Sequence, residues 1–263
     1  MRSFWSGAIS FGLIYIPVKL YNASETNELS FNMLRRSDKS RIRYVRVSAD
    51  TGEEVPNEEI VKGYEFSKGE YVILEEEDFK KANVKKTQTI DIVTFVDAAQ
   101  VDYRLYEKPY YLEPIKGAAK AYALLRDALQ RSGKVGVGRF VLRNRETMGV
   151  VKPEGQVIVL NQMRYASEIR PPDELTLPGT GQVSEKELDL AVSLIATLTG
   201  DWEPEQYQDT YGEDLQRIIQ AKVEGREPEA ETEAPIPIEV TDLFAKLSQS
   251  LEQAKQQKAP GGA

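Results

Sequence analysis

The first 170 residues carry the hydrophobic pattern of β-strands. Alternating or continuous apolar runs, bounded by glycine, proline and polar residues, are typical of strands. The predicted strand regions are residues 8–20, 28–34, 41–47, 63–74, 89–96 and 110–114, and three runs between residues 135 and 163. Within residues 63–74, the sequence Ser67-Lys68-Gly69 predicts the turn of a hairpin.

One clear helix interrupts these strands. Tyr122, Leu125 and Leu129 form a stripe of helical period that predicts a helix over residues 118–133, and Gly133 is placed to end it. A shorter helix is expected over residues 75–86, where acids precede lysines as the helix dipole favours. Many strands with one main helix predict a barrel-like β domain.

After residue 170 the pattern becomes that of helices. Ser184 and Glu187 have the spacing of a capping box and predict the start of a helix, which Gly200 would end. A second helix is expected over residues 211–225. The fold class predicted for the whole chain is therefore mainly β with a helical C-terminal part (β+α).

The end of the chain combines a linker with a helix. Residues 226–239 are acidic and contain proline, which predicts a flexible linker. Beyond it, residues 240–263 predict an amphipathic helix up to residue 255 and a frayed tail. The apolar side of this helix carries four residues: Leu243, Phe244, Leu247 and Leu251. Such a helix either docks on a partner or packs back onto its own subunit.

Composition removes several classes of function. The 263 residues include no cysteine and no histidine, so disulfides, thiolate nucleophiles, Cys/His zinc sites and Ser-His-Asp catalysis are excluded. There is no apolar run of about 18 residues that would predict a membrane span. The apolar start is broken by serines, glycines and Pro17, unlike a signal peptide. We expect a cytoplasmic protein without a membrane partner.

Charge is segregated along the chain. The sequence carries 34 basic and 42 acidic residues, yet residues 35–46 hold five arginines and one lysine beside a single acid, Asp38. These basic residues are Arg35, Arg36, Lys39, Arg41, Arg43 and Arg46. The planar guanidinium fork suits phosphate oxygens. With a Debye length of about 8–10 Å, distant acids do not cancel such a local field. If Ile42 and Tyr44 face a core, Arg41 and Arg43 point away from it.

Two further basic clusters fall in the same β domain. One is "KKANVKK", with Lys80, Lys81, Lys85 and Lys86; the other is "GRFVLRNRE", where strand alternation places Arg139, Arg143 and Arg145 in one register. Each cluster alone is compatible with a solvated surface, and the arginines of residues 35–46 could pair with the Glu-rich segment that follows them. Three clusters in one domain favour binding to the backbone of duplex nucleic acid.

Two apparent sites have weak patterns. "LEEEDF" at residues 74–79 has the acids of a hydrolase or calcium loop, but adjacent acids at a helix start do not converge and the EF-hand spacing is absent. "GKVGVG" at residues 133–138 lacks the Gly-Lys-Ser/Thr ending of a phosphate loop and precedes a strand. We expect no catalytic residue, metal or cofactor. A carboxylate hydrolase and a protein-binding scaffold remain the rival classes.

Several ordered motifs together resemble the bacterial Ku proteins. They are "SFWSGAISFGLIYIPVKLY", "SRIRYVRV", "YYLEP", "FVLRN", and "EPEQYQDTY" before "IIQAKVEG". The resemblance runs over about residues 1–225 and weakly into the last helix. It implies a non-enzymatic homodimeric ring that encircles the ends of broken double-stranded DNA. It also implies recruitment of an ATP-dependent DNA ligase for non-homologous end joining, and association with the nucleoid when the protein is bound to DNA.

The same resemblance implies roles for parts of the chain. Residues 1–180 would form the barrel with a bridging arm at about 35–75, and residues 181–225 a helical dimerisation region. The arm would present Arg35, Arg36, Arg41, Arg43 and Arg46 to DNA, with Lys80, Lys81, Arg143 and Arg145 in or near the ring lining. The terminal helix would be a candidate ligase-docking element. Some family members have two cysteines where this chain has Ser48 and Thr51, so no metal is expected here.

Overall fold

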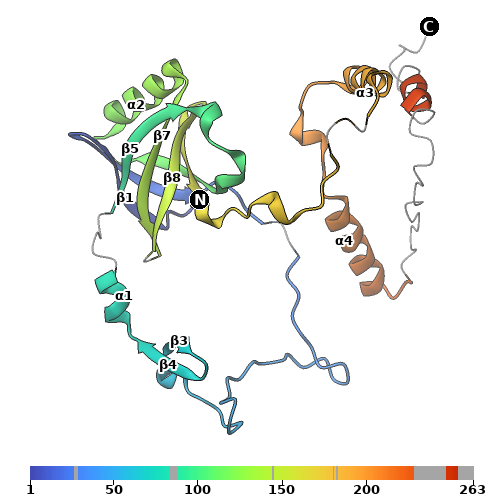
Figure 1. The fold of residues 1–263 in the computed structure, drawn as a ribbon. Coiled ribbons are helices and arrows are strands. Elements are labelled where there is room, and N and C mark those ends of the chain that lie inside the picture. The colour runs from blue at the N-terminus through green and yellow to red at the C-terminus, as the bar shows by residue number, and fades with distance from the viewer. Residues whose placement is uncertain are drawn as a thin grey trace. The chain divides into compact units, whose positions relative to one another are not determined.

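The computed structural model describes residues 1–26, 29–82, 88–143, 145–179, 181, 183–227 and 247–253, without the side chains of Lys80 and Ala82. The chain divides into two compact units, Met1–Pro171 and Pro172–Ala263 (Figure 1). No helix among the described residues is long and apolar enough to cross a membrane.

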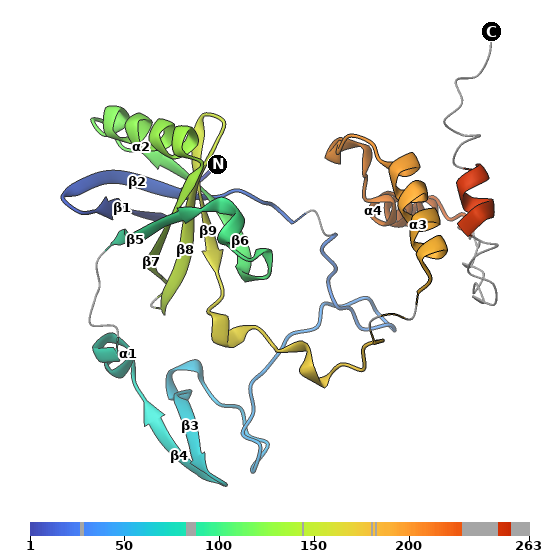
Figure 2. The same cartoon turned by 45° about the horizontal axis from the view of Figure 1, so that its top comes forward.

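The first unit contains a closed barrel with the strand order β1-β2-β6-β9-β8-β7-β5 (Figure 2). Its strands are β1 (Trp5–Phe11), β2 (Ile14–Asn22), β5 (Thr89–Asp97), β6 (Tyr106–Pro114), β7 (Lys134–Leu142), β8 (Arg145–Glu154) and β9 (Val157–Met163). β1 and β5 close the barrel as parallel neighbours, whereas the other neighbouring pairs are antiparallel. The barrel-like β domain predicted from the strand pattern is confirmed.

Helix α2 (Ala119–Ser132) packs on the barrel core. Tyr122, Leu125 and Leu129 are buried in the same cluster as Ile9, Ile158 and other strand residues. The predicted helical stripe is therefore confirmed. Gly133 ends the helix with φ of 65°, in the left-handed region that glycine adopts without a Cβ clash.

A buried tyrosine joins this helix to two strands. The Tyr122 hydroxyl donates to the carbonyl oxygen of Leu112 on β6 over 2.6 Å, and it accepts the backbone N–H of Ile158 on β9, also over 2.6 Å. Burial raises the pKa of Tyr122, so the hydroxyl keeps its proton. One side chain thus satisfies two backbone groups that the helix would otherwise cover without partners.

The pairing registers define the two ends of the barrel. β2 runs antiparallel to β6, with its last residue Asn22 opposite Tyr110 in the middle of β6, and β5 runs antiparallel to β7, with Asp91 opposite Arg139. β2 therefore ends, and β5 begins, at one barrel end. We call this end the rim. The turn between β7 and β8 also lies at the rim, while α2 follows β6 and precedes β7 at the opposite end.

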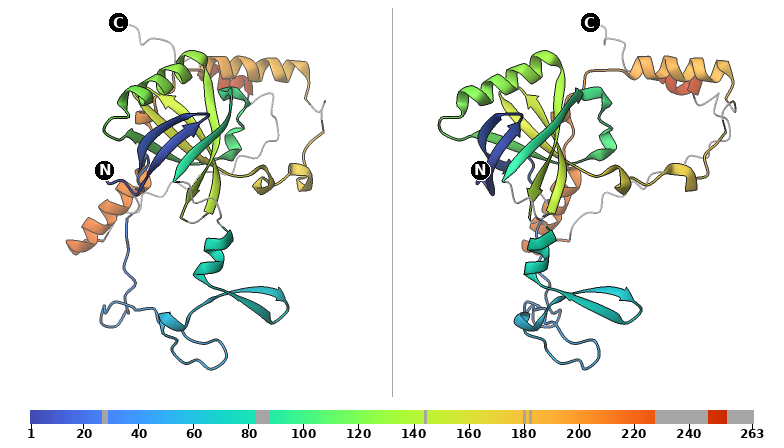
Figure 3. Two further views of the ribbon diagram at one scale, coloured as in Figure 1. Left: turned by 90° about the vertical axis from the view of Figure 1, so that its left-hand side faces the viewer. Right: turned by 60° about the vertical axis from the view of Figure 1, so that its left-hand side comes forward.

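The chain between β2 and β5 leaves the barrel and returns to it at the rim. We call residues 23–88 the arm. Its described elements are η1 (Asn57–Glu59), the hairpin β3 (Lys62–Ser67) and β4 (Glu70–Leu74), and helix α1 (Glu76–Ala82) (Figure 3). The predicted hairpin is confirmed, and the short helix is confirmed up to Ala82, whereas residues 83–86 of that prediction lie outside the described residues. No residue of 29–79 is buried, so the arm has no core of its own.

Two predicted strands in the arm are wrong. Residues 29–34 and 41–47 form no strand. They contribute only to the single bridges Leu34↔Arg41 and Val47↔Glu54, each of which closes a small loop. Ile42 and Tyr44 remain 45% and 80% exposed, so they face no core. The apolar pattern has the composition of a strand, but a strand also needs a neighbour to pair with and a surface to cover.

The second unit is helical in its described part. It contains η5 (Pro172–Glu174), α3 (Glu185–Leu198), η6 (Pro204–Gln206), α4 (Thr210–Val223) and a helical stretch over residues 247–253. The remaining short helices, η2 (Ala98–Gln100), η3 (Tyr103–Leu105) and η4 (Ala166–Glu168), belong to the first unit.

The helix starts follow from side-chain capping. The predicted capping box is confirmed, because Glu187 accepts the Ser184 N–H over 2.8 Å and Ser184 Oγ accepts the Glu187 N–H over 3.4 Å. α3 ends at Leu198 with Thr199 as its C-cap, before the predicted Gly200. Most of the predicted linker at 226–239, together with Leu243 and Phe244, lies outside the described residues.

We expect Tyr122→Phe to lower the free energy of unfolding of the barrel by about 1–3 kcal/mol, because it removes the buried hydroxyl that pairs two backbone groups. The measurement is urea unfolding followed by circular dichroism. Tyr103→Phe, at an exposed tyrosine, is the matched control and should leave the midpoint unchanged. Equal midpoints for both variants would contradict the structural role of the Tyr122 hydroxyl.

Candidate nucleic-acid interface

The first loop of the arm is held by one acid. Asp38 accepts hydrogen bonds from the Arg35 guanidinium, with Nε at 3.0 Å from Oδ1, and from the backbone N–H of Ser40 at 3.1 Å. The Arg35 guanidinium holds the pKa of the Asp38 carboxyl well below its usual range. The loop also places Lys39 in the left-handed region, with φ of 58°. Arg35 therefore shapes the loop as well as contributing charge.

The second loop of the arm is anchored by Arg46. Its Nη1 donates to Asn57 Oδ1 over 2.8 Å, and its carbonyl oxygen accepts the N–H of Val55 over 2.8 Å. The guanidinium is paired with a neutral amide, so its full charge remains. Arg46 therefore holds the second loop as well as contributing charge.

Three arm arginines keep their guanidinium groups uncommitted. Arg36, Arg41 and Arg43 are exposed and form no ion pair with any carboxylate among the described residues. The sequence also allowed these arginines to pair with the Glu-rich segment that follows them. The described ion pair of the cluster instead joins Arg35 to Asp38, within the cluster itself. Among the described residues, these three arginines therefore have no carboxylate partner of their own.

The lysines of the second cluster are only partly described. Lys81 lies on α1 with its Nζ 3.7 Å from Asp78 Oδ1, an exposed pair of adjacent helical turns. The side chain of Lys80 lies outside the described residues, as do Lys85 and Lys86. The roles assigned to Lys80 and Lys81 from the resemblance stay predictions.

Arg143 and Arg145 lie at the rim, but not on one face of one strand. β7 ends at Leu142, which pairs with Arg145, so the chain reverses between them. Arg143 has φ of 50°, the left-handed conformation of a tight turn. The expected common register of Arg139, Arg143 and Arg145 is wrong, because the alternation breaks at this turn. Each of the two strand arginines forms an ion pair: Arg139 Nη1 lies 3.8 Å from Glu146 Oε1, and Arg145 Nη2 lies 3.3 Å from Glu168 Oε1.

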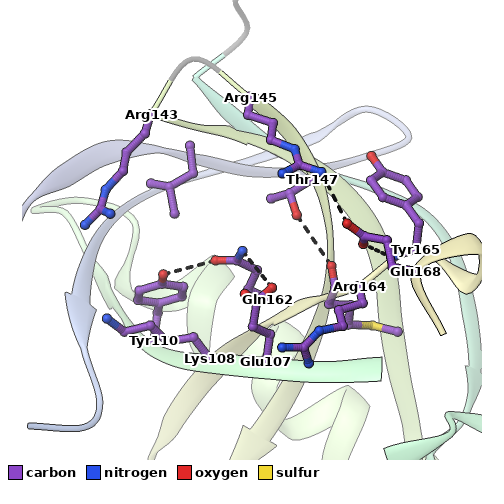
Figure 4. A pocket seen from close by; sticks show the side chains of 12 residues that line it. Glu107, Lys108, Tyr110, Arg143, Arg145, Thr147, Gln162, Arg164, Tyr165 and Glu168 are labelled. Atoms are coloured by element: carbon purple, nitrogen blue, oxygen red, sulfur yellow. Dashed lines mark hydrogen bonds and ion pairs between the residues drawn. The ribbon is translucent and has the colours of Figure 1, made fainter. Parts of the chain in front are cut away.

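The rim is hollowed next to this turn. A pocket of about 490 Å³ is lined by Arg143, Arg145, Lys108 and Arg164, together with neutral side chains and two glutamates. Figure 4 shows Arg143 and Arg145 on one side of the pocket, with Lys108 and Arg164 across from them. We call this hollow the rim pocket.

Sequence reasoning missed Lys108 and Arg164. Lys108 stands alone among aromatic residues on β6, and Arg164 directly follows β9, so neither belongs to a visible basic cluster. Their proximity arises from the pairing of β6 with β9, in which Lys108 faces Gln162. In the sequence, each is only a single basic residue close to one end of a predicted strand. That position indicates a shared site only once the order of the strands in the barrel is known.

The structure places the predicted arginines in two parts of the first unit, and Lys80 and Lys81 on α1. Arg35, Arg36, Arg41, Arg43 and Arg46 lie together in the arm, and Arg143 and Arg145 lie together at the rim. The arm leaves the barrel and returns to it at that same rim. Exposed guanidinium and ammonium groups are suited to contacts with the phosphate backbone.

Comparison with known proteins identifies the family of the barrel. The family model described as "Ku70/Ku80 beta-barrel domain" matches residues 10–190. A "Non-homologous end joining protein Ku" from Opitutus terrae is 44% identical over 256 residues, which cover 96% of this chain and 92% of that protein. One from Archaeoglobus fulgidus is 42% identical, with 97% and 100% covered. One from Frankia casuarinae is 44% identical, with 97% of this chain but 64% of that longer protein covered.

Proposed function

Because this chain belongs to the Ku family, we propose that it binds the ends of double-stranded DNA as a homodimeric ring. Binding would not depend on base sequence. The bound ring would protect the ends and recruit an ATP-dependent DNA ligase for non-homologous end joining. In this proposal the protein itself forms and breaks no covalent bond.

One observation carries the proposal. The arm combines uncompensated arginines with a stretch, residues 29–79, in which no side chain is buried. Phosphate neutralisation by arginine and lysine supplies sequence-independent affinity through the release of counterions. A closed path of protein around the duplex would add selectivity for ends, since DNA without an end cannot be threaded.

Exposed apolar side chains support the homodimer. Phe31, Tyr44, Tyr64, Phe66 and Tyr71 in the arm are each more than half exposed. In the second unit, Leu188, Val192 and Ile195 follow each other at helical spacing along α3 and are also exposed. Large apolar side chains exposed in such number favour an interface. A second copy of the chain would cover it, in line with the dimerisation region expected at residues 181–225.

The terminal helix is the proposed docking element for the ligase. In the described stretch 247–253, Leu247 and Leu251 stand one turn apart and are half-buried. Leu243 and Phe244 would extend the same apolar side by one more turn. In the alternative, this helix serves only the packing of its own subunit, and its removal would also abolish binding to DNA ends.

The decisive experiment compares binding to a linear duplex with binding to the same DNA as a relaxed, covalently closed circle, across a salt series. We expect binding to the linear form alone, with an affinity that falls steeply as salt rises. Equal binding to both forms would keep a basic surface but remove the ring. Absence of binding to either form at every salt concentration would leave the protein-binding scaffold.

We expect Arg41→Gln with Arg43→Gln to weaken binding to all duplex sequences alike. The slope of log affinity against log salt should become shallower by about 2 for each protomer, because each lost charge removes one phosphate contact. The control is Lys120→Gln with Arg131→Gln, an equal change of charge on exposed residues of α2. A loss restricted to certain sequences, or an equal loss in the control, would contradict the arm's role.

Deletion of residues 240–263 should leave binding to linear duplex intact while abolishing the stimulation of a cognate ATP-dependent DNA ligase. Both are measured on the same preparation, by gel shift and by joining of linear plasmid. Substitution of Leu247 and Leu251 by serine in the full chain is the narrower variant. If either change also abolishes end binding, the helix is part of the subunit's structure and the docking role is lost.

A further inference from the structure

Three segments far apart in the sequence build the rim pocket. The start of β6 brings Glu107, Lys108 and Tyr110; the β7–β8 turn brings Arg143 and Arg145; and the end of β9 with the following turn brings Gln162 and Arg164. All of them lie in the first unit, on strands of one closed barrel or in the turns directly after them. The pocket is thus built on paired strands.

The two carboxylates of the pocket are already engaged. Glu107 Oε2 accepts from Gln162 Nε2 over 3.1 Å. Glu168 accepts from the Arg145 guanidinium over 3.3 Å and from the backbone N–H of Tyr165 over 2.7 Å. Lys108, Arg143 and Arg164 have no ion pair with any carboxylate among the described residues. These three cations line one pocket, in which the two carboxylates are held by other partners.

Three side chains of the pocket are joined by hydrogen bonds, and we call this chain the relay. The Tyr110 hydroxyl donates to Gln162 Oε1 over 3.1 Å, and the Gln162 amide N–H donates to Glu107. Tyr110 is buried, and burial raises its pKa, so it remains a donor. Because the relay occupies Glu107, this carboxylate is held on Gln162 and does not pair with Lys108 on the neighbouring position of β6 (Figure 4).

The environment of the cations favours an anion over water alone. Lys108 is half-buried and its ammonium lies 5.8 Å from the centre of the Tyr110 ring. Arg164 Nη1 has a single long hydrogen bond, 3.4 Å to the carbonyl oxygen of Tyr106, so most of its donors stay available. Like charges that line one pocket repel each other, and a bound counter-charge relieves that repulsion.

We propose that the rim pocket binds a phosphate group, held by Lys108, Arg143 and Arg164. A tetrahedral anion with several acceptor oxygens matches the donors of two guanidinium groups and one ammonium. The assignment of that phosphate to a DNA strand rests on the proposed function. Lys108 and Arg164 then extend the DNA-contacting surface from the arm and the β7–β8 turn to the barrel strands β6 and β9.

The test uses Lys108→Gln with Arg164→Gln, which removes two charges and keeps most of each side chain. The full chain is titrated with linear duplex across a salt series. We expect affinity about tenfold lower or more, and a salt slope lower by about 1 per protomer, because one phosphate contact is lost. Lys120→Gln with Arg131→Gln, on α2 at the opposite barrel end, is the control and should match the unaltered chain. Unchanged affinity and slope in the pocket variant would overturn the proposal while the proposed function stands.

A second measurement does not depend on DNA. Inorganic pyrophosphate is titrated into ¹⁵N-labelled protein, and the side-chain amide signal of Gln162 is followed by NMR. We expect this signal to shift in the unaltered chain and in the control, and to stay in place in the pocket variant. If the unaltered chain ignores linear duplex but shows this shift, the proposed function fails and the phosphate pocket stands. Absence of the shift in the unaltered chain would overturn the pocket.

Two sources of the phosphate are distinguished by the duplex itself. Blunt duplexes with and without 5′-phosphates are compared in the unaltered chain and the pocket variant. An equal loss of affinity for both duplexes assigns the pocket to an internal backbone phosphate. A loss confined to the 5′-phosphorylated duplex assigns it to the strand terminus.

Discussion

The barrel depends on the seam where β1 and β5 meet as parallel strands and close the sheet on itself. The N–H of Ala8 donates to the carbonyl oxygen of Gln88 over 2.9 Å, and the Ser10 hydroxyl donates to Asp91 Oδ1 over 2.8 Å. The backbones approach so closely that a Cβ at Gly7 would collide with the Gln88 carbonyl oxygen. Because the two strands are parallel, β5 begins at the barrel end where β1 begins and β2 ends. The seam therefore fixes where the arm leaves the barrel and where it returns.

The charge at the rim, where the arm joins the barrel, differs from the net charge of the whole protein. The chain has a formal net charge of −8, yet its acids in the rim pocket are tied to Gln162, Arg145 and a backbone N–H. A carboxylate that is already hydrogen-bonded in place cannot turn to neutralise a neighbouring cation without losing those bonds. Within about one Debye length of the rim, the field follows the uncompensated cations and not the total charge. A positive surface and a negative chain are therefore compatible.

The sequence predicted those parts of the fold that are determined locally or by periodicity. The α2 stripe, the Ser184–Glu187 capping box and the hairpin at Ser67–Gly69 follow from spacing within one element, and the structure has all three. The strands expected at 28–34 and 41–47 were wrong because β-propensity describes how a residue fits a half-buried sheet, and the arm offers no such sheet. The arginine clusters were visible as runs of charge. Lys108 and Arg164 were not, because they are separated by a large part of the sequence and meet only through the pairing of β6 with β9.

The arm differs physically from the barrel to which it is attached. Ordering a chain segment has an entropic cost of about 1–2 kcal/mol per residue, which the barrel offsets by burying apolar side chains. The arm buries none over residues 29–79, and its aromatic side chains stay exposed. In the proposed homodimer, the second subunit would cover those aromatic side chains while the guanidinium groups of Arg41 and Arg43 meet the duplex. The shape of the arm and the affinity for DNA would then both depend on assembly, so that dimerisation and end binding stabilise each other.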